Sequence, residues 1–162
     1  MGKRQNNRKK MIMSISCAVL LTLLYRLIFS FSAQSGEQSG SLSMMISEKC
    51  VAFINSITGG NWTEAVMTSM AGYFENPIRK LAHFAEYAVM GILVYGMWRP
   101  WLKPGKKLCF IVIIWLFLSA AADEVHQLFV PDRSGNLPDV LLDTLGGCFG
   151  MALMILLEKN RK

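Results

Sequence analysis

The sequence predicts an all-α integral membrane protein, a bundle of four transmembrane helices with short interfacial helices in the first outer loop. Of its 162 residues, 52% are hydrophobic and only 17% are charged, and this charged share is well below that of soluble globular domains. Apolar runs recur at residues 11–31, 81–98, 108–122 and 140–157, without the polar face that a helix of a soluble bundle needs. The length suits one domain, so we treat residues 1–162 as a single unit.

The first predicted span covers residues 11–31. About 20 helical residues cross the hydrocarbon core of a bilayer, and this run reaches that length with one charge, Arg26. A cleaved signal peptide is the alternative, because basic residues precede the run and Ser30-Phe31-Ser32 offers a small-residue cleavage site. We favour a retained anchor, since the run is longer than the usual apolar core of a signal peptide and contains Arg26.

Residues 32–78 form the predicted outer loop. The loop begins with the Ser-, Gly- and Gln-rich stretch FSAQSGEQSGSLS, which indicates exposed, irregular chain. Apolar residues then recur at helical spacing in residues 42–57 and 62–74. We therefore expect two short amphipathic helices that lie in the membrane interface or cap the bundle.

The other predicted spans cover residues 79–98, 108–128 and 138–157. Each reaches the length of a membrane span only when polar residues at one of its ends are included. When each helix is threaded through the membrane, these polar ends all fall on the same, outer side. The bundle is thus expected to carry its polar residues in one layer.

Basic residues predict the orientation of the chain. Twelve of the 17 lie before the first span, between the second and third spans, and after the fourth, with a single acidic residue among them. Short cytoplasmic segments are enriched in Lys and Arg, so both termini are expected in the cytoplasm, and the net charge of +6 does not indicate a nucleic-acid partner. These residues are Lys3, Arg4, Arg8, Lys9, Lys10, Arg99, Lys103, Lys106, Lys107, Lys159, Arg161 and Lys162.

Ionisable side chains gather at one depth of the predicted bundle. Counted at 1.5 Å per residue, every span places at least one of them within roughly 10 Å of the outer surface. A buried charge costs about 2.5–3.5 kcal/mol near the centre of a membrane helix on insertion scales, so such a layer requires a reason. The layer comprises Arg26, His83, Glu86, Asp123, Glu124, Asp139 and Asp143.

Two interpretations of this layer stay open. The one we favour is an outward-facing cleft for catalysis or ligand binding, because titratable groups of several kinds converge there. The other is a structural network that only fixes helix packing, with the carboxylates neutralised by basic side chains. Those side chains would be Arg26, Arg79, Lys80 and Arg133.

The last span also predicts close helix packing. Its stripe of Asp139 and Asp143 continues to Gly146 and Gly150, a small-residue face that allows another helix to approach. The same face could support a dimer, so an oligomer is possible.

We predict no cofactor and keep a divalent metal as a lesser alternative. His83 with Glu86, and Asp123 with Glu124 and His126, are ligand types that helices of a bundle can combine. Their spacing is not a zinc signature, and His126 is expected to point away from the stripe of Asp123 and Gln127. The choice among Mg²⁺, Ca²⁺ and Zn²⁺ stays open.

Four sequence blocks resemble the VanZ-like family of small bacterial membrane proteins. RKLAHFAEYAVMG at 79–91 is similar to the family's Lys-x-x-His-Phe-x-Glu-Tyr block, and DEVHQLFVPDR at 123–133 to its Asp-Glu-x-x-Gln block ending in Arg. LPDVLLDTLGGCFG at 137–150 is similar to its Asp-x-x-x-Asn/Asp block followed by glycines, and FSAQSG at 31–36 to its Phe-Ser-x-Gln-Ser segment. Asp143 stands where many relatives carry Asn.

The resemblance implies a multi-pass protein of the bacterial cell membrane and an envelope function. The family takes its name from a protein associated with low-level resistance to the glycopeptide teicoplanin. Carried over by motif, and in agreement with the depth argument, the expected catalytic residues are His83, Glu86, Asp123 and Glu124. The expected ligand-binding residues are Lys80, Tyr87, Gln127, Arg133, Asp139 and Asp143.

We therefore expect an envelope protein that binds or modifies a lipid-linked or cell-wall component and affects teicoplanin susceptibility. Its partners would be the bilayer and a lipid-linked cell-wall precursor or the glycopeptide. Were it an enzyme, which stays open, Glu86 or Asp123 would act as general base and His83 as acid, with Lys80 and Arg133 holding an anionic headgroup. A structural or partner-binding protein is one alternative. Transport is disfavoured, because the cytoplasmic halves of the second and third spans hold no acidic or basic residue, and the weakly acidic groups there are only Cys109 and Tyr95.

Overall fold

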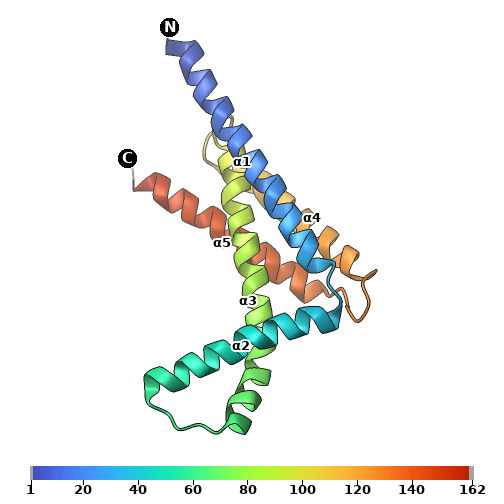
Figure 1. Ribbon diagram of the computed structural model, residues 1–162. Coiled ribbons are helices and arrows are strands. Elements are labelled where there is room, and N and C mark those ends of the chain that lie inside the picture. The colour runs from blue at the N-terminus through green and yellow to red at the C-terminus, as the bar shows by residue number, and fades with distance from the viewer. Residues whose placement is uncertain (1, 161–162) are drawn as a thin grey trace.

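The computed structural model describes residues 2–160, which fold into five helices without a strand (Figure 1). The all-α prediction is thus confirmed for this part of the chain. Arg161 and Lys162, two of the predicted cytoplasmic residues, lie outside it. The helices are α1 (Gly2–Ser32), α2 (Gly36–Thr58), α3 (Glu64–Trp98), α4 (Lys106–Gln127) and α5 (Leu137–Lys159).

Three of these helices, α1, α4 and α5, are long and apolar enough to cross a membrane. The most apolar stretch of each has a mean hydropathy of 2.1. Large apolar side chains on all three remain uncovered by protein: Leu23 is 55% exposed, Leu118 60% and Leu145 62%. Surfaces of this kind are unfavourable in water and suit the hydrocarbon of a bilayer, so the chain is a membrane protein.

The predicted second interfacial helix and second span are wrong as separate elements. Residues 64–98 form one continuous 35-residue helix, α3, which passes through Pro77. At 1.5 Å per residue α3 is about 52 Å long, well beyond the thickness of a hydrocarbon core. α3 is not among the three helices that are long and apolar enough to cross a membrane, because its polar residues lower its hydropathy. Three of the four predicted membrane spans are thus supported.

The predicted exposed loop after residue 31 is mostly helical, which corrects the expected start of the first outer helix. α2 begins at Gly36 because Ser35 and Gln38 form a capping box: Ser35 Oγ accepts from the Gln38 backbone N–H, and the Ser35 N–H donates to Gln38 Oε1, each at 3.2 Å. The helix ends at Gly59, whose φ of 64° is readily adopted only by glycine. The Ser-, Gly- and Gln-rich composition of residues 31–43 indicated a loop, and the prediction therefore missed this capping box.

α2 crosses the first half of α3, and the two form a hairpin at one end of the bundle (Figure 1). The contact is polar as well as apolar. Ser47 Oγ donates a 2.6 Å hydrogen bond to the carbonyl oxygen of Ala71 in a fully buried environment. Nearby, Glu75 accepts from Ser43 and pairs with Arg79. These contacts join α2 to the part of α3 that precedes the site.

Replacing Ser47 by alanine should lower the free energy of unfolding by about 1 kcal/mol, because one buried hydrogen bond between α2 and α3 is lost. Thermal unfolding of the purified protein in detergent would measure the change. Ser41→Ala is the matched control, since the exposed Ser41 hydroxyl bonds only to Gln38 of its own helix. Equal melting temperatures for the two variants would contradict a clamping role for Ser47.

The second half of α3 packs against α5 along glycines, as the small-residue stripe predicted. A Cβ atom on Gly146 would collide with the carbonyl oxygen of Phe84, and one on Gly150 with that of Ala88. The obstructing atoms belong to the backbone of α3, so the two helices are in direct main-chain contact. Around this seam lie buried apolar side chains of α1, α3, α4 and α5, which include Ile28, Tyr87, Met90, Val94, Leu116 and Met151.

Both described ends of the chain lie toward the same end of the bundle (Figure 1). The connections between α1 and α2 and between α4 and α5 lie toward the opposite end, where the α2–α3 hairpin also projects. The polar ends of the helices that the sequence placed in one layer therefore meet at this second end.

Candidate functional site

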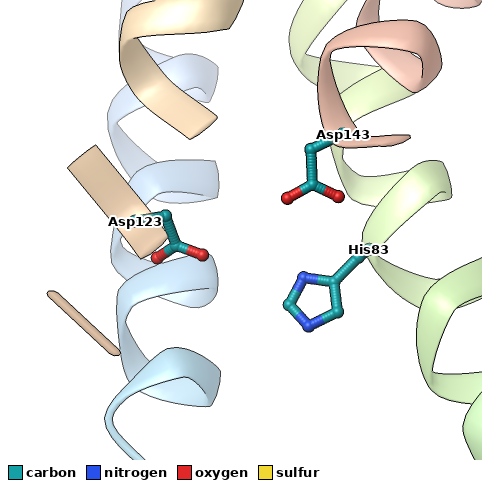
Figure 2. A group of neighbouring side chains, drawn as sticks. All are labelled: His83, Asp123 and Asp143. Carbon is teal, nitrogen blue, oxygen red and sulfur yellow. The ribbon is translucent and has the colours of Figure 1, made fainter. Parts of the chain in front are cut away.

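Three helices contribute to a compact polar cluster at the end of the bundle that carries the hairpin. We call His83 of α3, Asp123 of α4 and Asp143 of α5 the three-residue cluster. One ligand atom from each side chain lies within 4.8 Å of the corresponding atoms of the other two. Figure 2 shows the carboxylates of Asp123 and Asp143 and the imidazole of His83 turned toward a common space.

The close approach of α3 and α5 explains why His83 and Asp143 meet. Gly146, one turn after Asp143, contacts the backbone of Phe84, the neighbour of His83. With no side chain between the helices at this level, the two polar side chains come into reach across the seam. The glycine stripe is thus the local feature that positions the site.

The two aspartates have different surroundings. Asp123 Oδ2 accepts hydrogen bonds from Ser32 Oγ at 2.9 Å and from Gln127 Nε2 at 3.1 Å. Asp143 is 1% exposed, and its Oδ1 has no hydrogen-bond partner among the described residues. A buried carboxylate oxygen without a donor costs free energy, so Asp143 is the incompletely satisfied member of the cluster.

Arg133, in the connection between α4 and α5, ties this end of the bundle together. Its guanidinium donates to the carbonyl oxygens of Phe31 and Gln34, at 3.2 Å each, and to Gln127 Oε1 at 3.4 Å. Burial and the neighbouring Arg79 lower the pKa of Arg133, but a guanidinium remains charged in proteins. Arg133 therefore anchors the end of α1 to the α4–α5 connection.

Two further predicted site residues, Glu124 and Asp139, lie at the N-terminus of α5. Glu124 Oε2 accepts a 2.7 Å hydrogen bond from the backbone N–H of Asn136, the residue that precedes the helix. Asp139, in the first turn of α5, pairs with Lys80 of α3 at 3.0 Å, and both side chains are partly exposed. Glu124 thus has a structural partner, while Lys80 and Asp139 lie at the rim.

Glu86 and Tyr87 border the cluster without belonging to it. Glu86 Oε2 lies 3.9 Å from His83 Nδ1, which is too long for a direct hydrogen bond. Glu86 and His83 both line a cavity of about 260 Å³ beneath α2. Tyr87 is buried and faces α1 and α4.

Two residues of the predicted layer point elsewhere. His126 stacks on Phe29 of α1, with ring centroids 4.4 Å apart, and so points away from the cluster, as expected. Arg26 is exposed beside the same part of α1 and forms no ion pair within the described residues. The expectation that Arg26 neutralises a carboxylate of the layer is wrong. The position of Arg26 along α1 determines its depth, but its position around the helix axis turns its side chain toward α4.

The cluster lies between two cavities of different character. His83 and Asp143 line a polar cavity of about 240 Å³, whose wall also contains Arg79, Lys80 and Arg133. Asp123 is one of the residues that line an apolar groove of about 990 Å³ between α1 and α4. The groove walls include Tyr25, Phe29, Phe110, Ile114, Trp115 and Leu118.

Ser32 and the Asn136 backbone are contacts that the site prediction did not include. Ser32 lies in the FSAQSG segment that resembles the VanZ-like family, so a signal was present. Nothing in the sequence, however, placed its hydroxyl on Asp123. The Asn136 N–H is a backbone donor and leaves no trace in side-chain patterns.

These observations define a class of protein: a helical membrane protein in which two buried carboxylates and a half-buried imidazole meet where three helices come together. A family model described as VanZ/LLP1 matches residues 17–158. The chain therefore belongs to the VanZ/LLP1 family. Neither a search of curated proteins nor a search of solved structures finds a match.

Proposed function

We propose that this protein binds a lipid-linked cell-wall component at the outer face of the bacterial cell membrane and thereby alters susceptibility to glycopeptides such as teicoplanin. In this proposal both termini are cytoplasmic, and residues 79–98 of α3 provide a fourth span. The basic segments favour this orientation, because they lie at the end of the bundle opposite the cluster and cytoplasmic segments are enriched in Lys and Arg.

The observation that supports the proposal is the placement of the cluster between a polar cavity and an apolar groove. A lipid-linked molecule has a polar headgroup and a long hydrocarbon chain. The 240 Å³ cavity can receive part of the headgroup, while the groove between α1 and α4 offers an apolar surface for the chain. Asp123, which lines the groove, and Asp143, which lines the polar cavity, approach each other within the three-residue cluster.

The charges of the polar cavity favour a headgroup with both anionic and hydroxyl groups. Arg79, Lys80 and Arg133 can donate to phosphate or carboxylate oxygens. The carboxylates in the same wall, Glu124, Asp132, Asp139 and Asp143, can accept from sugar hydroxyls or amide N–H groups. A phosphorylated saccharide joined to a lipid combines these features.

The decisive experiment compares abundance with protection in the same cells. Glu86→Gln, Asp123→Asn and Asp143→Asn would be expressed in a glycopeptide-sensitive Gram-positive host, with the wild type and an empty vector. We expect at least the Asp143→Asn variant to reach the membrane abundance of the wild type. We expect the same variant to lose the teicoplanin protection that the wild type provides. Complete protection by all three variants at normal abundance would contradict the proposal.

Filling the groove tests the chain-binding part separately. Ala122→Trp places an indole in the groove, since Ala122 is one of its lining residues. We expect the amount of lipid that copurifies in mild detergent, measured by mass spectrometry, to fall at least about fivefold, because an indole occupies the space of several methylene groups. Leu145→Trp is the control, because Leu145 is 62% exposed on α5 and lines neither cavity. Equal lipid content in both variants would contradict a chain-binding groove.

The second candidate is a structural or partner-binding protein. The hydrogen bonds that join Ser32, Asp123, Gln127 and Arg133 favour it, because they link α1, α4 and the α4–α5 connection. This function predicts that abundance and protection fall together in the Asp123→Asn variant. The same expression experiment therefore separates the two candidates.

A further inference from the structure

The three-residue cluster brings two buried carboxylates together, and no Lys or Arg of residues 2–160 forms an ion pair with either of them. Asp123 and Asp143 are 9% and 1% exposed, and each offers an oxygen within 4.8 Å of the other and of a His83 nitrogen. Like charges at this distance repel strongly where water is excluded. Either a proton or a metal ion is needed to balance the pair.

The basic side chains nearby are engaged elsewhere. Lys80 pairs with Asp139, and Arg79 pairs with Glu75. The Arg133 guanidinium donates to two backbone carbonyls and to Gln127, which in turn donates to Asp123. None of these cations forms an ion pair with Asp123 or Asp143 among the described residues, so the cluster retains its negative character.

Asp143 adds a second and independent observation. Its side chain is almost fully buried, its Oδ1 has no hydrogen-bond partner in the described part of the chain, and Figure 2 shows its carboxylate facing Asp123 and His83. Buried carboxylate oxygens in proteins nearly always have a partner. An oxygen held without one beside an imidazole and a second carboxylate is suited to a metal ligand.

We infer that His83, Asp123 and Asp143 form a site for a divalent cation of the Zn²⁺ or Mn²⁺ type. Such ions bind imidazole nitrogen and carboxylate oxygen at about 2.0–2.2 Å, so three ligands of one ion lie about 3–4 Å from one another. The ligand atoms of the cluster lie within 4.8 Å of one another, so metal binding would draw the three side chains inward by an amount on the order of 1 Å. Three ligands from three helices leave further coordination positions toward the polar cavity.

The second sphere of this site is partly in place. Asp123 receives hydrogen bonds from Ser32 and Gln127 on Oδ2, which orient the carboxylate and leave Oδ1 available. Bonds of this kind hold metal ligands in position. A cation here would also offset the carboxylates of the polar cavity and, with Lys80 and Arg79, favour a phosphate group. The site stands on donor geometry and does not depend on which lipid the protein binds.

Metal binding to the purified full-length protein tests the inference directly. The protein is stripped with chelator in detergent and dialysed against Zn²⁺, Mn²⁺, Mg²⁺ or Ca²⁺, and bound metal is measured by mass spectrometry. We expect about one equivalent of Zn²⁺ or Mn²⁺ per chain, and a rise in melting temperature of about 5–10 °C at saturating metal. In Asp143→Asn the affinity should fall at least about tenfold and the rise should disappear.

Two controls keep the outcome decisive. Glu48→Gln removes one negative charge from an exposed position on α2 that lines none of the three cavities, and it should bind metal as the wild type does. His83→Gln replaces Asp143→Asn if the latter does not fold. No bound metal in the wild type would overturn the inference in favour of a shared proton, and unchanged binding by both cluster variants would place the metal elsewhere.

Discussion

Gly150→Leu is expected to remove most of the folded protein from the membrane. A Cβ atom at this position would already overlap the carbonyl oxygen of Ala88 in α3, and leucine adds three further carbons. Overpacking of a core costs about 1–3 kcal/mol when side chains can move aside. Here the obstacle is backbone, so α5 itself must shift, and the cost should approach a large part of the total stability of about 5–15 kcal/mol.

The measurement is the yield of monodisperse protein and its melting temperature after extraction in mild detergent. Gly72→Leu is the matched control, because Gly72 also lies within a helix, α3, but a Cβ atom there meets nothing within 4 Å. Leucine at that site should leave yield unchanged and favour the helix slightly. A Gly150→Leu protein with the yield and melting temperature of the wild type would show that the α3–α5 seam is not as close as described.

Apolar runs were sufficient to predict the class of the fold, whereas the orientation predicted from the basic segments stays a prediction. The runs at residues 11–31, 108–122 and 140–157 lie in α1, α4 and α5, whose ends agree with the predicted spans except at the start of α1. Hydropathy works here because a membrane helix must satisfy its backbone internally and present apolar side chains to lipid. Helix ends in polar sequence are not under that constraint, so α1 extends to Gly2.

The region between the first two spans could not be predicted from composition. The Ser-, Gly- and Gln-rich stretch forms the first turns of α2, because the Ser35–Gln38 capping box satisfies the N-terminal backbone groups. The predicted break between the second outer helix and the second span is absent, because α3 continues through Pro77. The packing of α2 across α3, which periodicity along one segment does not encode, holds both segments in helical form.

Depth along each helix placed His83, Asp123 and Asp143 at a common level, but it did not tell which side chains of that level meet. Asp123 and Asp143 meet His83, whereas Glu86 only borders His83 at 3.9 Å and Glu124 accepts from the Asn136 N–H. Which side chains meet depends on the rotation of each helix about its axis and on the distance between neighbouring helices. In the sequence, only the glycine stripe indicated that one pair of helices is close. The catalytic and ligand-binding roles assigned from sequence stay predictions.

Replacing Arg133 is expected to have the largest effect of any change outside the helices. Its guanidinium donates to Phe31, Gln34 and Gln127, and hydrogen bonds from charged groups contribute about 1.5–3 kcal/mol each when well formed. Because Arg133 is only half-buried and one bond is 3.4 Å long, we expect a combined loss of about 2–4 kcal/mol in Arg133→Gln. For a chain of this size that corresponds to a fall of about 5–12 °C in melting temperature.

Arg133→Lys should lose nearly as much stability, since a single ammonium group lacks the planar fork that spans three acceptors. Limited chymotrypsin digestion provides a local readout, because Leu128 and Phe129 are 60% and 83% exposed beside the connection that Arg133 holds. Cleavage there should accelerate in both variants and remain slow in Arg8→Gln, which changes an exposed arginine near the start of α1. Wild-type cleavage rates and melting temperatures for Arg133→Lys would mean that the positive charge, rather than the three-way anchor, is what this position provides. In that case Arg133 would act chiefly on the charge of the polar cavity.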